Sequence, residues 1–187
     1  MLDDLRATIS RDPALYGVRR AEVVLYPGLW AVWGHRLAHR LHRWGVPFVP
    51  RALSQWVRGL TGIEIHPGAT IGRRLFIDHG AGVVIGETAV IGDDVTMYHH
   101  VTLGGRGWWR DPKGSQRHPT VGDRVMLGTG ATVLGPVQVG ADARIGAHAL
   151  VLQDIPPGAW VDAPPAVVRI ANREEEPSCR RIPVSLP

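Results

Sequence analysis

The sequence has little cysteine and no long hydrophobic run, and each absence excludes a class of protein. Its single cysteine, Cys179, leaves no disulfide framework within the chain, which fits a reducing cytoplasm. No stretch approaches the roughly 18 apolar residues of a membrane-spanning helix, so no span is expected. The first residues include two acids and lack an apolar core, so we expect no secretory signal. These absences together predict a cytoplasmic protein.

The excess of positive over negative charge is also small. The formal net charge is +4, a mild excess that attracts anions such as nucleotide phosphates but is too small to indicate a nucleic-acid-binding protein. The chain has 187 residues, of which 44% are hydrophobic and 20% charged. This size and composition suit one packed domain, with or without a helical arm. We therefore expect neither nucleic acid nor a membrane among its partners.

A six-residue repeat dominates the centre of the chain. Aliphatic side chains recur at every sixth position, with one slip of two residues, at Ile65, Ile71, Ile77, Ile85, Ile91, Met97, Leu103, Val121, Leu127, Val133, Val139, Ile145 and Val151. A period of six is neither the helical period nor the simple strand period. It fits three flat sides per coil, each with one side chain pointing inward. The repeat therefore predicts a mainly β fold, a parallel β-helix of hexapeptides.

The rest of the chain is arranged around this solenoid. Residues 1–62 are predicted to form an N-terminal helical and oligomerisation segment, and residues 63–170 the β-helix domain. Within that domain, residues 104–120 abandon the aliphatic pattern and are rich in glycine, proline and charge, which predicts an extruded loop. A loop this long inside a compact fold is usually functional. Residues 171–187 are charged and aperiodic, so a mobile tail is expected.

One predicted helix of the N-terminal segment carries a strong apolar stripe. Its apolar side chains recur at intervals of three and four, at Trp30, Trp33, Leu37, Leu41 and Trp44. Arginines lie off this stripe, so a basic helix lying on a membrane surface is one interpretation. We favour packing on another helix or on a partner subunit, because a second apolar helix follows. Two short helices cannot bury these tryptophans alone, so a contact between subunits is expected.

The slip in the repeat falls at residues 78–82, where two ionisable side chains and two glycines cluster. Irregularity inside a regular scaffold is where function is usually placed. A histidine that acts as a general base needs a carboxylate to fix its tautomer and stabilise its cation. Glu64, about one turn earlier, is expected to supply it to His79. Neighbours on a strand point to opposite faces, so we assign Asp78 to a substrate ammonium instead.

A second group of candidates ends the predicted loop. The planar fork of Arg117 suits a carboxylate, so the whole set fits a zwitterionic substrate that carries a hydroxyl. A zinc site would need a second histidine five residues beyond the first, but Val84 follows His79 and Asp123 follows His118 at that spacing. No metal is therefore expected. Three further histidines are expected to be buried and bonded to backbone: His99, His100 and His148.

The motifs of three segments resemble those of one known family. The segments are residues 62–72, residues 76–89 with their Ile-Asp-His-Gly motif, and residues 101–105 followed by Arg-His-Pro at 117–119. They are similar to serine O-acetyltransferase, in its short form, over residues 8–170. The resemblance implies a left-handed coil, although connections between parallel strands are usually right-handed.

This resemblance implies transfer of acetyl from acetyl-CoA to the hydroxyl of L-serine, giving O-acetyl-L-serine for cysteine biosynthesis. His79 would be the general base and Glu64 its orienting carboxylate. Serine-binding roles fall on Asp12, Asp78, Arg117 and His118. An acetyl-CoA groove between adjacent subunits of a homotrimer would involve Gly105, Thr129, Arg144 and Ala147. The backbone N–H near Gly105 would stabilise the oxyanion. The helical segment would join trimers into a dimer of trimers.

Departures from the family pattern leave alternatives open. The loop carries Trp108 and Trp109, His99 and His100 replace a Gln-Gly pair, and residues 162–166 replace Gly-Val-Pro-Ala. Another hydroxylated amino acid, such as homoserine or a modified serine, is therefore an alternative acceptor. A non-catalytic CoA-binding scaffold and a zinc hydratase are alternative functions. The chain ends in Ser-Leu-Pro and not in the isoleucine that docks into O-acetylserine sulfhydrylase in some members, so that complex is not expected.

Overall fold

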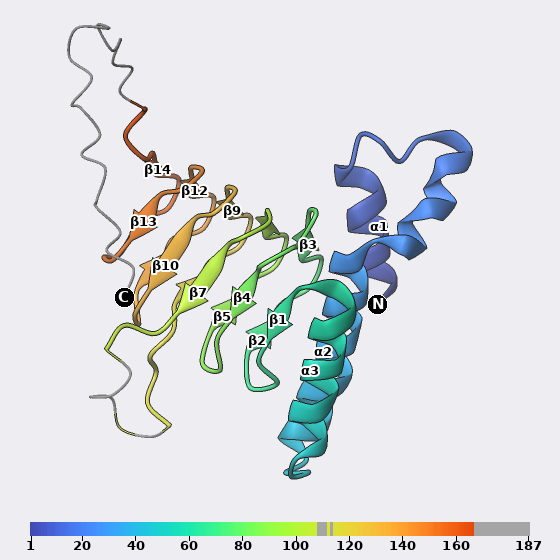
Figure 1. Ribbon diagram of the computed structural model, residues 1–187. Helices are drawn as coiled ribbons and strands as arrows, with labels where there is room; N and C mark the ends of the chain where they lie inside the picture. Colours follow the sequence, from blue (N-terminus) through green and yellow to red (C-terminus); the bar gives the residue numbers. More distant parts are fainter. Residues whose placement is uncertain (108–111, 113, 167–187) are drawn as a thin grey trace, which may run out of the picture.

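A helical arm and a solenoid make up the protein (Figure 1). The computed structural model describes residues 1–107, 112 and 114–166. The arm lies at the end of the solenoid where the first strands are found, and the last strands lie at the far end (Figure 1). The predictions for the Trp108–Trp109 loop and for the tail at 171–187 fall outside the described residues.

Four helical elements form the arm: α1 (Leu2–Arg11), the 3-10 helix η1 (Gly17–Leu25), α2 (Pro27–Arg43) and α3 (Val49–Thr61). Pro27 suits the start of α2, because its φ is already helical and its missing N–H would have no partner there. Gly62 ends α3 in the left-handed region with a φ of 71°, which glycine adopts without steric cost. Within the described part of the chain, no helix has the length and apolar character needed to span a membrane.

Fourteen short strands of the described residues form three parallel sheets, one for each side of the coil. Their orders are β1-β4-β7-β10-β13, β2-β5-β8-β11 and β3-β6-β9-β12-β14, called here the first, second and third sheets. The strands are β1 (Glu64–Ile65), β2 (Thr70–Ile71), β3 (Phe76–Ile77), β4 (Val84–Ile85), β5 (Val90–Ile91), β6 (Thr96–Met97), β7 (Thr102–Gly104), β8 (Thr120–Val121), β9 (Met126–Leu127), β10 (Thr132–Leu134), β11 (Gln138–Val139), β12 (Arg144–Ile145), β13 (Leu150–Val151) and β14 (Trp160–Val161).

The repeat positions form the core of the solenoid. Twelve of the thirteen predicted aliphatic residues are buried, and Ile71 is partly buried against them. Burying one such side chain contributes about 1.5–3 kcal/mol, so the stack supplies most of the apolar stabilisation. The small residues two positions earlier, such as Ala69 and Ala131, are fully buried at the corners. The predicted parallel β-helix is confirmed.

Side chains of the arm cap the open end of the solenoid. The first coil has no preceding coil to donate hydrogen bonds to its carbonyl groups, and a buried backbone carbonyl without a partner is costly. The arm supplies these partners: Ser54 Oγ donates to Ile65 O at 2.9 Å, Arg36 to Gly72 O at 2.9 Å and Arg11 to Arg74 O at 3.0 Å, and His39 Nδ1 lies 2.8 Å from Pro67 O. The arm is therefore an end cap.

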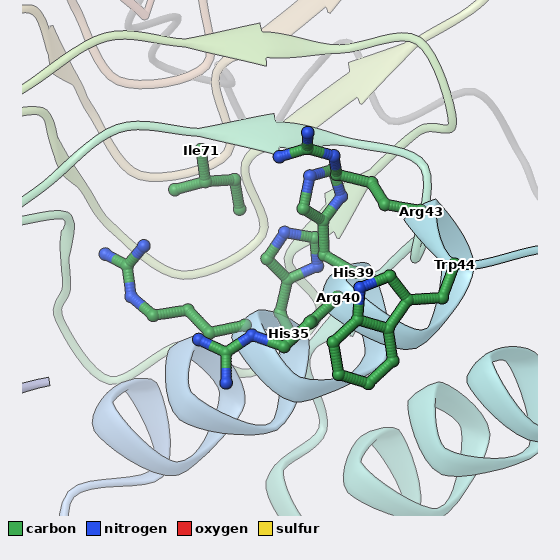
Figure 2. A pocket seen from close by; sticks show the side chains of 7 residues that line it. His35, His39, Arg40, Arg43, Trp44 and Ile71 are labelled. Carbon is green, nitrogen blue, oxygen red and sulfur yellow. The ribbon is translucent and has the colours of Figure 1, made fainter.

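Figure 2 shows a cavity of about 450 Å³ between α2 and β2, with these residues labelled around it: His35, His39, Arg40, Arg43, Trp44 and Ile71. Burial lowers the pKa of His35 to about 3, so its ring is neutral. Arg36, also on this wall, is held by Asp4 at 2.7 Å. Arg36 and His39 of this cavity thus serve the cap, and none of the predicted site residues lines it.

Candidate active site

A second cavity, of about 590 Å³, lies where the arm meets the frame slip. Its walls come from the turn after α1, from the end of η1 and the start of α2, and from the corner after β3. Three of the predicted site residues line it together: Asp12, Asp78 and His79. Tertiary structure therefore joins residues that are more than sixty positions apart in the chain.

The frame slip turns the His79 side chain outward. His79 follows β3 with a φ of 58°, a left-handed conformation that histidine tolerates better than most residues. Gly80 and Gly82 are also left-handed, and a Cβ on Gly80 would lie only 2.4 Å from the Ile63 side chain. The backbone at Gly80 therefore packs directly on the core, whereas the His79 side chain is 75% exposed. This exposure leaves the imidazole accessible to a substrate.

Asp78 lies closer to His79 than the strand rule predicted. His79 Nε2 is 3.9 Å from Asp78 Oδ2, so the expectation that the two side chains point apart is wrong. The alternation of side chains holds only in extended backbone, and His79 is left-handed. Glu64 instead forms ion pairs with Arg51 at 3.2 Å and Arg58 at 3.1 Å, both on α3. Its role as the partner of His79 stays a prediction.

Asp12 is held rigidly in the cavity wall. Its Oδ1 accepts the backbone N–H of Ala14 at 2.7 Å, and its Oδ2 accepts the hydroxyl of Tyr26. Burial first, and then the hydrogen bond to Asp12, raise the pKa of Tyr26 to about 12, so the phenol remains a donor. Glu22 and Asp78 also line this cavity. Three carboxylates around one space favour a cationic group such as an ammonium.

Arg117 and His118 form a separate cluster with two residues that the sequence did not indicate. Arg117 is ion-paired with Glu87, and Thr88 hydrogen-bonds to both Arg117 and His118. Burial raises the pKa of Glu87, but the bond from Arg117 and nearby positive charges hold it below its ordinary value. Glu87 and Thr88 lie in the segment 76–89 that resembles the family, but the sequence analysis assigned neither residue a role. Only the stacking of coils brings them beneath the end of the loop.

The two clusters occupy different corners of the solenoid. Asp78 and His79 lie between the third and first sheets, whereas Arg117 and His118 lie between the first and second sheets. The described residues of one chain therefore do not bring the general-base candidate and the carboxylate-binding candidate into one site. Gly105 lies with the second cluster, since a Cβ there would be 3.4 Å from Arg117 O.

The remaining residues predicted to bind the cofactor lie on later coils, at or beside the same corner as His79. Thr129 lies between β9 and β10, and Ala147 between β12 and β13. Arg144 projects from the third sheet, where its guanidinium carbon lies 5.0 Å from the ring centroid of Trp160. Successive coils are about 4.8 Å apart. Thr129 and Ala147 lie on successive coils and Arg144 shares the coil of Ala147, so together with the corner of His79 they form a row parallel to the solenoid axis. Such a row suits a long, extended ligand.

The other histidines of this corner differ from expectation. His100 and His148 are exposed with φ of 58° and 59°, so the expectation that they are buried is wrong. A left-handed corner residue points away from the core, and these rings cover Gly82 and Gly130, where a Cβ would lie 2.2 and 2.5 Å from the respective Nδ1. His99 is half-buried, and its Nδ1 has no hydrogen-bond partner among the described residues. In the same part of the chain, no cluster of three or more metal-ligating side chains is found.

A three-sided parallel β-helix with an exposed histidine at a frame slip defines a class, the hexapeptide-repeat transferases. Residues 118–153 match the family model described as bacterial transferase hexapeptide (six repeats). The chain is 56% identical over 169 residues to the serine acetyltransferase of Mycobacterium tuberculosis, covering 90% of this chain and 71% of that protein. It is also 56% identical over 162 residues to the serine acetyltransferase of Helicobacter pylori strain J99, covering 85% of this chain and 92% of that one. The chain belongs to the serine acetyltransferase family.

Solved structures agree with this assignment. Serine acetyltransferase isoform 3 of Entamoeba histolytica, solved in complex with cysteine, aligns with a TM-score of 0.82 at 38% identity and covers 92% of this chain. The chain spans 60% of the length of that protein. The Neisseria gonorrhoeae serine acetyltransferase, solved in complex with serine, aligns with a TM-score of 0.79 at 38% identity, covering 89% of this chain and 66% of that one. The predicted left-handed sense of the β-helix is thereby confirmed.

Proposed function

We propose that this chain is a serine O-acetyltransferase, which transfers acetyl from acetyl-CoA to the hydroxyl of L-serine and supplies O-acetyl-L-serine to cysteine biosynthesis in the cytoplasm. The observation that carries the proposal is the cavity of about 590 Å³ in which Asp12, Asp78 and His79 meet. Membership of the serine acetyltransferase family supports the same acceptor and acetyl donor.

His79 is the general base of this proposal. Its exposed imidazole takes the proton of the serine hydroxyl while the oxygen attacks the thioester carbonyl, and it returns a proton to the departing thiolate. A carboxylate beside the ring stabilises the imidazolium that forms. Asp78 lies 3.9 Å from Nε2 in the single subunit, whereas Glu64, the partner that the family resemblance implies, is ion-paired with Arg51 and Arg58.

The ends of the substrate fit the charges of the two clusters. The carboxylates of Asp12 and Asp78 suit the serine ammonium, and the fork of Arg117 suits its carboxylate. The backbone N–H of Gly105 is assigned to the oxyanion of the tetrahedral intermediate. Thr129, Arg144 and Ala147 are assigned to acetyl-CoA, whose extended form suits their row along the corner.

A complete site requires more than one subunit. The clusters of His79 and Arg117 lie on different corners, so a neighbouring copy must bring its own corner against them. A homotrimer meets this requirement with one repeated contact that closes a ring. A groove of about 610 Å³ on α2 and α3, with Trp30, Trp33 and Trp56 in its lining, supports a further contact that pairs two trimers.

Release of free thiol from acetyl-CoA tests the proposal, with L-serine, L-homoserine and L-threonine as acceptors. We expect a strong preference for serine in kcat/KM, and a preference for homoserine would replace the acceptor while keeping the reaction class. The variant is His79→Asn, because asparagine also tolerates the left-handed φ of 58° but cannot serve as the base. A positioned base contributes about 10²–10⁴-fold, so kcat is expected to fall by that factor. Near-normal turnover by His79→Asn contradicts the mechanism.

A further inference from the structure

The cavity between α2 and β2 holds positive charge that the end cap does not use. Of the three arginines that line it, Arg36 is ion-paired with Asp4 and donates to Gly72 O, so it serves the cap. Arg40 and Arg43 line the same cavity, and neither is ion-paired with an acidic side chain in the described part of the chain. No acidic side chain is among the lining residues. Two positive charges therefore border this space without a counterion from those residues.

The spacing of the arginines on α2 gathers them at this cavity. Arg36, Arg40 and Arg43 follow one another at intervals of four and three residues, so they share one face of the helix. Like charges at these spacings repel each other. The negative end of the helix dipole favours cations in the last turn and offsets part of this repulsion, but it supplies no counterion. Figure 2 shows Arg40 and Arg43 beside the rings of His35 and His39.

His35 contributes a buried polar atom without a partner. Its side chain lines the cavity and is only 5% exposed, and its Nδ1 has no hydrogen-bond partner among the described residues. A buried polar atom without a partner is costly, so one in the wall of a cavity indicates that water or a ligand supplies the bond. Burial lowers the pKa of His35 to about 3, so the ring adds hydrogen bonding and no charge. This atom indicates a polar occupant independently of the arginines.

The chemistry of the lining matches a small oxyanion. The planar guanidinium fork binds phosphate and sulfate oxygens through paired, charge-assisted N–H donation. A volume of about 450 Å³ suits a small-molecule site and exceeds the size of one tetrahedral anion. Trp44 also lines the cavity and is 71% exposed, so its indole offers a flat face to a planar group attached to that anion. None of these residues lines the active-site cavity.

We propose that this cavity is a second ligand site, which binds a phosphate or sulfate group through Arg40 and Arg43, either as the free anion or as the anionic end of a small planar ester. The site is separate from the proposed acetyl transfer and does not depend on it. A ligand here contacts α2 on one side and Ile71 of β2 on the other, so it fastens the arm to the solenoid.

Isothermal titration calorimetry on the full-length oligomer tests the site with inorganic phosphate, sulfate and adenosine 5′-monophosphate, and chloride at equal ionic strength is the blank. Arg40→Gln and Arg43→Gln each remove one charge and keep most of the side-chain length. Arg20→Gln is the matched control, because Arg20 is exposed on η1 and lines neither cavity. Trp44→Ala removes the flat face and keeps both arginines.

We expect wild type to bind one phosphate or sulfate per chain with a Kd of roughly 1 mM or tighter. Arg40→Gln and Arg43→Gln are each expected to weaken binding on the order of 10-fold, the loss of one charged contact, whereas Arg20→Gln binds as wild type does. Tighter binding of adenosine 5′-monophosphate than of phosphate, lost in Trp44→Ala, identifies an ester as the ligand, and equal binding identifies the free anion.

Two results overturn the second site. One is the absence of saturable binding by wild type, and the other is binding in Arg40→Gln and Arg43→Gln that equals binding in Arg20→Gln. In the second case the anion occupies another part of the protein, such as the corner of Arg117. Binding is measured without serine or acetyl-CoA, so failure of wild type to acetylate serine contradicts the proposed function alone.

Discussion

Gly28 provides a sharp test of how the arm positions the active-site cavity. It lies in the first turn of α2, next to Pro27 of the cavity wall, and it packs on the backbone just before Asp78. In Gly28→Ala, the new Cβ would be 2.2 Å from Ile77 O and 3.0 Å from Ile77 Cβ. Because real contacts of this kind stay above 3.0 Å, α2 must move outward by about 0.8 Å, the difference between 3.0 and 2.2.

The expected change in the free energy of unfolding of Gly28→Ala follows from two opposing effects. Alanine in place of glycine favours a helix by about 0.5–1 kcal/mol, whereas overpacking a rigid contact costs about 1–3 kcal/mol. We therefore expect Gly28→Ala to lower the free energy of unfolding by about 0.5–2 kcal/mol. The same movement separates Tyr26 and Pro27 from Asp78 and His79 across the cavity. Since about 1 Å of misplacement can cost on the order of 10²-fold, kcat/KM is expected to fall by 10-fold or more.

Urea unfolding and thiol-release kinetics measure both effects, and Gly59→Ala is the matched control. Gly59 lies in α3, and a Cβ added there would meet no atom within 4 Å, so alanine is expected to stabilise the helix and leave turnover unchanged. The two substitutions are chemically identical and differ only in what the new methyl group meets. If Gly28→Ala is as stable and as active as Gly59→Ala, the contact between α2 and the corner does not position the site.

Two further predictions concern the cap and the cofactor row. The pKa of the buried His35 is lowered to about 3 from an unfolded value of 6.5, so its contribution to stability is present above pH 6.5 and is lost as the pH falls toward 3. The melting temperature is therefore expected to fall less steeply with acidification in His35→Gln than in wild type. An equal fall in the two proteins refutes the assignment. Arg144→Ala is expected to raise KM for acetyl-CoA by about 10-fold, the equivalent of one charged contact, and to leave KM for serine unchanged, with Arg144→Lys as the milder control. An unchanged acetyl-CoA KM in Arg144→Ala removes this residue from the groove.

The architecture was predictable because its signal is local and repeated. Each hexapeptide places one aliphatic residue inward, so thirteen positions indicate the same coil, and twelve of these thirteen are buried in the structure. The slip at residues 78–82 was visible for the same reason, as a break in an otherwise regular frame. The histidine at the break indicated a general base before any contact was known, although the carboxylate predicted as its partner was Glu64 and not the adjacent Asp78.

Partners of the charged groups could not be read from the sequence. Asp12 meets Tyr26, Glu64 meets two arginines of α3, and His118 meets Thr88, thirty residues earlier. These pairings depend on how coils stack across an insertion and on how the arm folds back over the first coil. Neither is periodic, so neither leaves a pattern in the chain.

The sequence by itself determined the β-helix, the inward positions and the location of the proposed base, because these follow from a period and from its one interruption. Only the tertiary structure decided that the arm closes the solenoid, that Asp78 and His79 lie together, and that the two clusters occupy different corners. The physical reason is that a repeat specifies which side chains point inward. The neighbour of each outward side chain is chosen by the stacking of distant segments.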